Sequence, residues 1–223
     1  MIKLVAFDWN GTLFADTIAC FEADNHMLQK LGLKPITIKT FREKFAVPVV
    51  NFYASLGLNK EQLLKGAKIN EQIFHQYYEQ RAAKIRTRQH TRQVLDWLNK
   101  NKIESIIFSN HTLQGITKQL ERLKISQFFS SILANTELDT SFKENTKEKK
   151  LKYYIESRGL KFNQALVIGD TTEEVTIGKS LGIVTVALTG GYNSTPRLKA
   201  AKPNFLITDL GNLVNIVREV NEA

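Results

Sequence analysis

Three polar residues follow short apolar segments of this 223-residue chain, namely Asp8, Ser109 and Asp170. Two carboxylates and a hydroxyl are a set of groups that could transfer a phosphoryl group. Such a transfer needs a carboxylate that attacks the phosphorus atom and a metal ion that screens the negative charges. The three side chains can meet if the apolar segments before them are neighbouring strands of one sheet.

The first of these segments leads into a loop that suits a phosphate group. Lys3 to Phe7 predicts a buried strand, and the turn pair Asn10-Gly11 predicts a loop directly after it. Backbone N–H groups of a glycine-containing loop, here those of Gly11 and Thr12, can hold phosphate oxygens. Asp8 is therefore the candidate nucleophile, although an aspartate that ends a strand often serves as a turn or capping residue instead.

Strands and helices alternate along most of the chain. Further apolar runs predict strands at Ile103 to Phe108, Ala165 to Ile168 and Ile183 to Leu188. Helices are predicted at Thr91 to Asn101, Gln114 to Leu123, Lys147 to Arg158 and Thr172 to Leu181. This alternation predicts an α/β fold with a Rossmann-like parallel sheet that helices cover on both faces. Ligand sites in such sheets lie at the carboxyl ends of the strands, where the three polar residues are expected.

The interval from Asp16 to about Lys84 interrupts this alternation, because it shows helical periodicity and no convincing strand. Helices are predicted near Thr17 to Leu31, Thr40 to Phe45, Val49 to Leu56 and Glu61 to Arg81, the last with Asn59 as N-cap and Gln62 as capping-box partner. We therefore predict an α/β core of residues 1–15 and 85–223 and an all-helical cap of residues 16–84. Such a cap would close over the substrate and exclude water.

The residues around these positions resemble the motifs of the haloacid dehalogenase (HAD) superfamily. Phe7-Asp8-Trp9-Asn10-Gly11-Thr12-Leu13 resembles the first motif, in which two aspartates two positions apart precede Gly-Thr-Leu. Ser109 after Ile106-Ile107-Phe108 resembles the second motif, and Gly169-Asp170 before Thr171-Thr172-Glu173-Glu174 resembles the fourth. The layout is similar to the branch with a helical C1 cap, which includes phosphoglycolate phosphatases and β-phosphoglucomutases. Leu188 to Tyr192 and Pro203 to Leu210 are similar to the closing segments of that branch.

The resemblance implies a role for each of these positions. Asp8 would be the nucleophile, and Mg²⁺ would be bound by Asp8, the backbone carbonyl of Asn10, Asp170 and Glu174. The phosphoryl group would be bound by Ser109, Asn110, Lys147, Gly11 and Thr12.

Two positions of the resemblance have alternatives. The third motif is a lysine that pairs with the nucleophile, and counting back from Gly169 favours Lys147, with Lys143 as the alternative. Asp170 could also serve as N-cap of the helix that follows it. Its neighbour Glu173 is expected to face solvent.

Asn10 stands where phosphatases of the superfamily have an aspartate that protonates the leaving group and then activates water. An amide cannot exchange a proton at neutral pH, and general acid–base help is typically worth about 10² to 10⁴ in rate. Alkyl phosphates should therefore suffer most, and an acyl phosphate or similarly activated substrate least. Three accounts stay open: a phosphatase with slow or specialised chemistry, a regulatory protein that senses phosphate, and a deliberate inactivating substitution. Asn-Gly is also the dipeptide most prone to deamidation, which could convert some Asn10 to aspartate.

Other residues indicate less specific roles. The histidines show no paired metal spacing, which argues against a zinc site, but His111 is expected near the cleft. The basic cluster from Arg81 through Lys84, Arg86 and Arg88 to Arg92 predicts a solvated hinge, because it lacks the interleaved aromatics of a nucleic-acid surface. Cys20 is expected to pack in a helix. Phe45, Phe52 and Tyr53 are pocket candidates, although aromatics at helical spacing usually belong to a core.

The composition narrows the class of protein. An apolar fraction of 43% and a charged fraction of 24% exclude a disordered or fibrous chain. No apolar run approaches the roughly 18 to 20 residues that span a bilayer, no secretion signal is evident, and a single cysteine cannot form an internal disulfide, so we expect a cytoplasmic protein. The net charge of +9 fits an anionic substrate, a nucleic acid or a lysine-rich proteome, but no nucleic-acid module is present.

Together these patterns predict a Mg²⁺-dependent phosphatase or phosphotransferase, monomeric or homodimeric, that acts on a small phosphorylated metabolite. The alternative is a catalytically impaired HAD-like regulatory or phosphate-binding protein.

Overall fold

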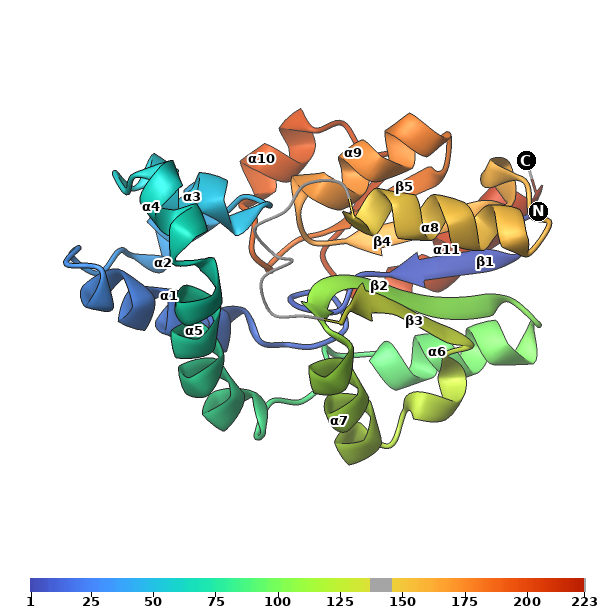
Figure 1. The fold of residues 1–223 in the computed structure, drawn as a ribbon. Coiled ribbons are helices and arrows are strands. Elements are labelled where there is room, and N and C mark those ends of the chain that lie inside the picture. The colour runs from blue at the N-terminus through green and yellow to red at the C-terminus, as the bar shows by residue number, and fades with distance from the viewer. Residues whose placement is uncertain (137–145, 223) are drawn as a thin grey trace.

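The computed structural model describes residues 1–136 and 146–222. A six-stranded parallel sheet with the strand order β3-β2-β1-β4-β5-β6 forms its centre (Figure 1). The strands are β1 (Leu4–Phe7), β2 (Glu104–Thr112), β3 (Ser131–Asn135), β4 (Ala165–Gly169), β5 (Val184–Leu188) and β6 (Phe205–Ile207). The predicted α/β class with a Rossmann-like parallel sheet is confirmed.

The central position of β1 brings the polar residues to one edge of the sheet. Phe7 pairs with Ile107 of β2 on one side and with Ile168 of β4 on the other. Asp8, Ser109 and Asp170 each come within two residues of these paired positions, at the same edge. All four residues of β1 are buried, as expected of a central strand covered on both faces.

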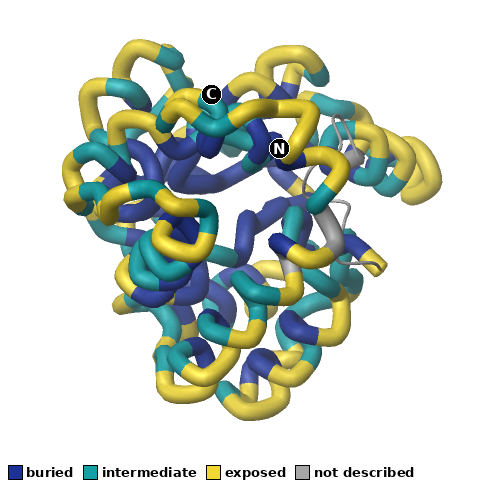
Figure 2. Tube along the Cα trace, turned by 60° about the vertical axis from the view of Figure 1, so that its left-hand side comes forward, coloured by how far each residue is buried: buried dark blue, intermediate teal, exposed yellow. Residues whose placement is uncertain are grey.

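Helices cover both faces of the sheet, and buried residues are concentrated at its centre (Figure 2). One face carries α6 (Thr91–Lys100), α7 (Leu113–Leu123) and α11 (Leu213–Glu222); the other carries α8 (Thr146–Ser157) and α9 (Thr172–Leu181), with α10 (Thr195–Ala200) packed beside α9. The pleat of β1 divides its residues between two cores, because successive side chains of a strand point to opposite faces. Val5 and Phe7 join the first core, and Leu4 and Ala6 the second.

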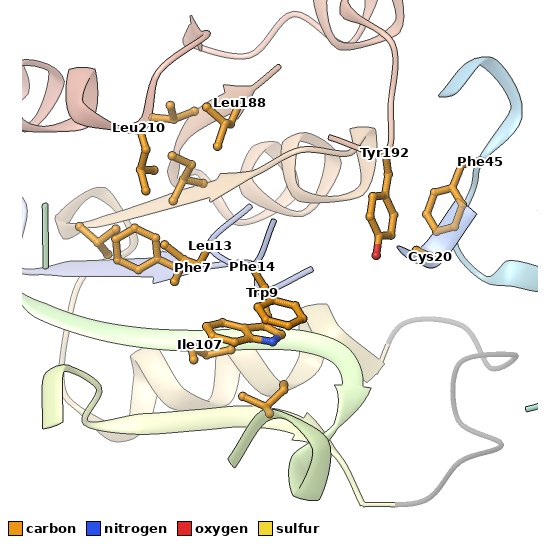
Figure 3. Packing of buried hydrophobic residues seen from close by; sticks show 14 of the residues in the cluster. Phe7, Trp9, Leu13, Phe14, Cys20, Phe45, Ile107, Leu188, Tyr192 and Leu210 are labelled. Atoms are coloured by element: carbon orange, nitrogen blue, oxygen red, sulfur yellow. The ribbon is translucent and has the colours of Figure 1, made fainter. Parts of the chain in front are cut away.

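The loop after β1 is anchored by aromatic packing. The rings of Trp9 and Phe14 are stacked with their centroids 5.3 Å apart, next to Leu13 (Figure 3). Trp9 Nε1 also donates a hydrogen bond of 2.5 Å to Gln119 Oε1 in α7. This packing and the hydrogen bond fix Trp9, the residue before Asn10, against the core and α7.

Five helices between β1 and α6 lie beyond the carboxyl ends of the central strands (Figure 1). They are α1 (Thr17–Lys30), α2 (Ile38–Lys44), α3 (Val49–Ser55), α4 (Lys60–Lys65) and α5 (Ala67–Ala82). The expected single helix from Glu61 to Arg81 is wrong, because the chain forms two helices that meet at Gly66, a residue type that disfavours helix interiors. Asn59 does cap α4, since its side chain accepts the Gln62 N–H at 3.1 Å.

Two features of the sheet differ from the expectation. β3 was not predicted, because its apolar run Ile132-Leu133-Ala134 is only three residues long; as part of an edge strand, these residues are half-buried. β2 continues beyond Phe108 to Thr112 with an irregular register against β3, so Ser109 lies within the strand and not after it. Within the described residues, no helix is both long and apolar enough to cross a lipid bilayer.

Candidate active site

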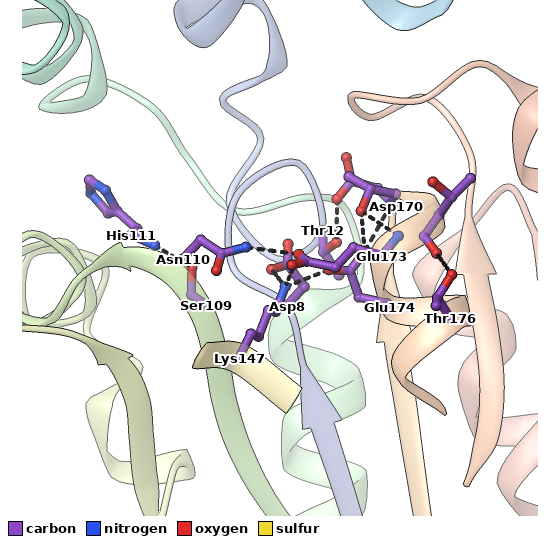
Figure 4. Close-up of polar contacts among 12 residues, drawn as sticks. Asp8, Thr12, Ser109, Asn110, His111, Lys147, Asp170, Glu173, Glu174 and Thr176 are labelled. Carbon is purple, nitrogen blue, oxygen red and sulfur yellow. Dashed lines mark hydrogen bonds and ion pairs between the residues drawn. The ribbon is translucent and has the colours of Figure 1, made fainter. Parts of the chain in front are cut away.

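The carboxylate of Asp8 is paired with the ammonium of Lys147 in α8. Asp8 continues the line of β1, because its N–H donates to the Ile168 carbonyl of β4 at 2.9 Å. Lys147 Nζ lies 2.7 Å from Asp8 Oδ1, and only 3% of the Lys147 side chain is exposed (Figure 4). The fold thus brings the candidate nucleophile to the favoured lysine from 139 residues away. Lys143, the alternative, lies outside the described residues.

Glu174 in α9 holds the same lysine from another side. Its Oε1 contacts Lys147 Nζ, and its Oε2 accepts from the Thr171 hydroxyl at 2.6 Å and the Thr171 N–H at 3.1 Å. The Thr171 hydroxyl in turn accepts the Glu173 N–H, so Thr171 and Glu174 form the capping box that begins α9. The alternative role of Asp170 as N-cap is therefore wrong, because Thr171 fills it.

Asp170 follows β4 and faces the loop after β1. Its Oδ1 accepts from the Thr12 hydroxyl at 2.8 Å, and its Oδ2 accepts from the Tyr192 N–H at 2.6 Å. The close approach requires glycine at position 11, which has a φ of +75°, and an added Cβ there would lie 2.2 Å from Asp170 Oδ2. Asp170 is completely buried in this contact.

Gly11 and Thr12, which the sequence assigned to the phosphoryl group, are engaged within the protein. The Gly11 N–H donates to the Phe14 carbonyl at 2.9 Å and to Asp16 Oδ1 at 2.7 Å. The Thr12 N–H lies 3.3 Å from the Trp9 carbonyl oxygen, and the Thr12 hydroxyl donates to Asp170. These contacts shape the loop, and a role of Gly11 and Thr12 in phosphate binding stays a prediction.

Negative charge is crowded around Lys147. Burial raises the pKa of Asp8 well above its ordinary value; Lys147 opposes this rise, and Glu174 and Asp170 add to it. Burial and the Glu174 charge raise the pKa of Asp170 to about 7. Burial lowers the pKa of Lys147, but Asp8 and Glu174 outweigh burial and hold that pKa well above its usual range.

This donor set fits a divalent cation. Buried carboxylates that repel one another would be neutralised by an added positive charge, and carboxylate oxygens are ligands that Mg²⁺ prefers. Within the part of the chain that the structure describes, however, no three His, Cys, Asp or Glu side chains already converge as a metal site. An ion would therefore require side-chain adjustment around Asp8 and Asp170.

Ser109, Asn110 and Glu173 line one cavity together with Asp8 and Lys147. Ser109 is 2% exposed, and its Oγ accepts the N–H of His111 at 3.1 Å. Asn110 Nδ2 donates to Glu173 Oε2 at 2.8 Å, and that oxygen lies 3.4 Å from Lys147 Nζ. The expectation that Glu173 faces solvent is wrong, because Asn110 and Lys147 both draw its carboxylate into the site.

Asn10 is held by residues that sequence reasoning missed. Its Nδ2 donates to Asp16 Oδ2 at 2.7 Å and to the Tyr78 hydroxyl at 2.8 Å. Asp16 stands one residue before α1, where an aspartate is typical of an N-cap. It makes no cap hydrogen bond and is completely buried, which no local signal indicates.

A cavity of about 130 Å³ lies between the helical insert and the sheet edge. Asp8, Asn10, Ser109, Asn110 and Lys147 form its floor, and Cys20, Asp24, Met27, Phe74, His75 and Tyr78 are among the residues that α1 and α5 contribute. Phe45 and Tyr53 also line it, whereas Phe52 packs against Phe41 with ring centroids 5.7 Å apart. Cys20 is buried, as expected.

His111 lines the part of this cavity that lies away from Asp8 (Figure 4). Its ring stacks on that of His75 with centroids 5.3 Å apart. Burial, aided by His75, lowers the pKa of His111 to about 4, so the imidazole is neutral at pH 7. Its Nε2 has no hydrogen-bond partner among the described residues.

Arg88 of the basic cluster is directed toward the loop that follows β1. Its guanidinium donates to the carbonyl oxygens of Gly11, at 3.1 Å, and of Thr189. Lys84 and Arg86 are exposed, as a solvated hinge requires. That interpretation is wrong for Arg88, which joins the loop after β1 to the loop after β5.

The fold and the site define an α/β protein with a buried aspartate–lysine pair at the carboxyl edge of a parallel sheet, beneath a helical insert. A family model described as haloacid dehalogenase-like hydrolase matches residues 5–188, which is most of the chain. The chain therefore belongs to the haloacid dehalogenase-like hydrolase family.

Curated relatives are identical to the chain at about a quarter of the aligned positions. A phosphoglycolate phosphatase from Pseudomonas fluorescens is 26% identical over 216 residues, covering 95% of this chain and 78% of the relative. A phosphoglycolate phosphatase from Vibrio cholerae is 24% identical over 222 residues and is covered over 97% of both chains.

Solved structures show the same fold along nearly the whole chain. A haloacid dehalogenase-like family hydrolase from Streptococcus pneumoniae superposes with a TM-score of 0.80 at 21% identity, over 97% of this chain and 98% of the other. A predicted phosphatase from Clostridium acetobutylicum gives a TM-score of 0.83 at 20% identity, over 98% and 99%.

Proposed function

We propose that the chain is a Mg²⁺-dependent phosphatase or phosphotransferase that acts on a small phosphorylated metabolite through an aspartyl-phosphate at Asp8. The observation that carries the proposal is the contact of 2.7 Å between Asp8 Oδ1 and Lys147 Nζ at the floor of the cavity. A nucleophilic carboxylate beside a cation is what transfer of an anionic phosphoryl group requires.

The first step forms a bond between Asp8 and phosphorus. A carboxylate oxygen of Asp8 attacks, the bond from phosphorus to the leaving oxygen breaks, and that oxygen departs with the electron pair. Lys147 offsets charge on the phosphoryl oxygens, and the Ser109 hydroxyl is available to donate to one of them. In the second step a water oxygen attacks phosphorus, Asp8 is released as a carboxylate, and the proton of the water passes to the departing phosphate.

Mg²⁺ would be held by Asp8, Asp170 and the backbone carbonyl of Asn10, where its charge would screen the nucleophile from the substrate. Glu174 belongs to the metal set that the resemblance implies. Its carboxylate is engaged by Lys147 and Thr171, so we assign it the role of holding Lys147 in place. Glu173, which shares the same ammonium, would support this role.

The substrate that we propose has a good leaving group. Asn10 has no proton to give at neutral pH, so the leaving oxygen must be stable without one. The relatives named phosphoglycolate phosphatase make 2-phosphoglycolate the first ester to test. Acyl phosphates are the class that Asn10 would hinder least.

The test is a screen of phosphate esters, including 2-phosphoglycolate, and of acyl phosphates, with and without Mg²⁺. Asp8→Ala is the control variant, and acid-quenched protein is analysed for a mass increase at the Asp8 peptide. We expect Mg²⁺-dependent phosphate release and a phosphoenzyme in the parent protein only. Equal rates in the parent and in Asp8→Ala would contradict the proposal.

Asn10 also favours a second candidate, a protein that binds phosphate without turning it over. This candidate predicts that phosphate raises the unfolding temperature of the parent protein more than that of Lys147→Met, while no substrate yields a phosphoenzyme. The two measurements together separate the candidates.

A further inference from the structure

Both hydrogens of the Asn10 amide are used within the protein. Nδ2 donates one to Asp16 Oδ2 at 2.7 Å and the other to the Tyr78 hydroxyl oxygen at 2.8 Å. A side-chain amide carries two N–H donors and one carbonyl acceptor. Asn10 Oδ1 has no partner among the described residues, and Asn10 lines the cavity. The group that Asn10 can offer to a ligand is therefore an acceptor.

Asp16 is a buried carboxylate whose surroundings are fixed by distant parts of the chain. Its Oδ1 accepts the Gly11 N–H at 2.7 Å. Its Oδ2 accepts the hydroxyl of Tyr78 in α5 at 2.6 Å and that of Tyr192 after β5 at 2.8 Å, besides the Asn10 amide. A buried carboxylate is stable when donors surround it, so each of these donors, the Asn10 amide included, stabilises Asp16.

The chemistry of Asp16 leaves one orientation for the amide. If the Asn10 side chain were turned by half a revolution, Oδ1 would stand at the position of Nδ2, against the carboxylate oxygen. Two acceptors would then face each other at the buried Asp16 carboxylate, which would lose a donor and gain a repulsive contact. The Asn10 carbonyl must therefore point away from Asp16.

We propose that Asp16 is a positioning residue that orients the Asn10 amide, presents its carbonyl oxygen to the substrate, and requires a hydrogen-bond donor at position 10. An aspartate there would put two carboxylate oxygens near 2.7 Å, the present distance from Nδ2 to Asp16 Oδ2, and like charges so close repel strongly in a buried site. An asparagine at position 10 avoids this repulsion, because its amide donates to the Asp16 carboxylate.

The orientation has a consequence for substrates that rests on the proposed function. An acceptor in the cavity can orient a water molecule or a substrate hydroxyl, but it cannot donate to the leaving oxygen. Asp16 would therefore make Asn10 a guide for the attacking water in the second step. This part of the inference deepens the proposed function, and the pairing of Asp16 with Asn10 does not depend on it.

A double-mutant cycle tests the pairing by stability. The variants Asn10→Asp, Asp16→Asn and the exchange Asn10→Asp/Asp16→Asn are unfolded with urea at pH 8. We expect Asn10→Asp to raise the unfolding equilibrium constant by about tenfold or more, and the exchange to recover part of the loss, because the amide at position 16 can donate to the carboxylate at position 10. An Asn10→Asp variant as stable as the parent, or an exchange no more stable than Asn10→Asp, would overturn the pairing.

A second measurement applies even if Asn10→Asp does not fold. Protein with ¹⁵N-labelled asparagine reports how fast the Asn10 side-chain N–H groups exchange with water, compared with exposed Asn99 in α6. Tyr78→Phe removes the acceptor of one Asn10 hydrogen, whereas Tyr192→Phe removes a donor from the same Asp16 oxygen without contacting Asn10.

We expect slow exchange at Asn10 in the parent, faster exchange in Tyr78→Phe, and little change in Tyr192→Phe. Exchange at Asn10 as fast as at Asn99 in the parent, or equal effects of the two tyrosine variants, would overturn the proposal. Neither readout uses turnover. A protein without phosphatase activity can therefore still show the pairing, and an active enzyme can still lack it.

Discussion

The Lys147 ammonium lies 2.7 Å from one Asp8 oxygen and also contacts Glu174, so one buried cation joins α8, β1 and α9. Removal of the cation would leave two buried carboxylates without their partner, which typically costs about 3 to 5 kcal/mol. Lys147→Met should therefore lower the free energy of unfolding by this amount and abolish phosphate release. Urea unfolding and the phosphatase assay measure the two effects. Lys149→Met, an exposed neighbour in the same helix, is the control and should change stability by less than about 0.5 kcal/mol.

The carboxyl of Asp170 should make stability and cation binding depend on pH in opposite directions. Burial raises the pKa of Asp170 from 3.8 to about 7, so the folded protein binds the carboxyl proton more tightly than the unfolded chain does. Without metal, the protonated carboxyl therefore contributes its full stabilisation below about pH 4, and this stabilisation is lost as the pH rises through 7. Divalent cations need the ionised form, so Mg²⁺ affinity should rise up to tenfold per pH unit below pH 7 and level off above it. Titration calorimetry from pH 5.5 to 8.5 measures this slope. An affinity independent of pH would contradict the prediction, and Asp170→Asn should flatten the slope.

The leaving group should control the rate because Asn10 cannot protonate it. Across a series of aryl phosphates, kcat/KM should fall steeply as the pKa of the leaving phenol rises. The exchange variant Asn10→Asp/Asp16→Asn has an acid at position 10 and should show a shallower slope, with a gain of about tenfold or more for the least acidic phenol. Equal slopes in the two proteins would show that the residue at position 10 does not protonate the leaving group.

Asn10 should deamidate slowly in the folded protein, although Asn-Gly sequences usually react readily. Deamidation requires the Gly11 nitrogen to attack the Asn10 side chain, but the Gly11 N–H is held by the Phe14 carbonyl and Asp16. We expect the gain of 1 Da at the Asn10 peptide to appear at least about tenfold more slowly in native than in urea-unfolded protein, as a difference of about 1.4 kcal/mol in barrier would give. Peptide mass spectrometry over several weeks provides the measurement. Equal rates would contradict the prediction.

Arg88, to which we assign no catalytic role, should stabilise the loop after β1. Its guanidinium donates to the Gly11 and Thr189 carbonyls, and hydrogen bonds from a charged donor are each worth about 1.5 to 3 kcal/mol. Arg88→Met should therefore lower the free energy of unfolding by about 2 kcal/mol or more. Arg86→Met, at an exposed position, should leave the unfolding free energy nearly unchanged. Similar losses in both variants would argue against the loop contact.

The sheet and the strand-end residues could be predicted because their signals are local. Apolar runs mark central strands such as β1 and β4, and a parallel sheet brings the ends of its strands to one edge. The edge strand β3 was not predicted because its apolar run, Ile132-Leu133-Ala134, is only three residues long, which suffices for an edge strand whose residues are mostly half-buried. The break between α4 and α5 rests on a single glycine, whose modest local cost does not by itself end a helix.

The sequence by itself determined the α/β class and the helical insert, because periodicity along the chain encodes them. It also indicated Asp8, Ser109, Lys147 and Asp170, because the residues around them resemble the HAD motifs. Only the tertiary structure decided which polar side chains meet across the chain. Asp16 contacts Tyr78 and Tyr192 over 62 and 176 residues, and no pattern within a helix or strand specifies such pairs. Asn10 was visible in the sequence as a missing acid, and the fold shows the carboxylate that holds its amide.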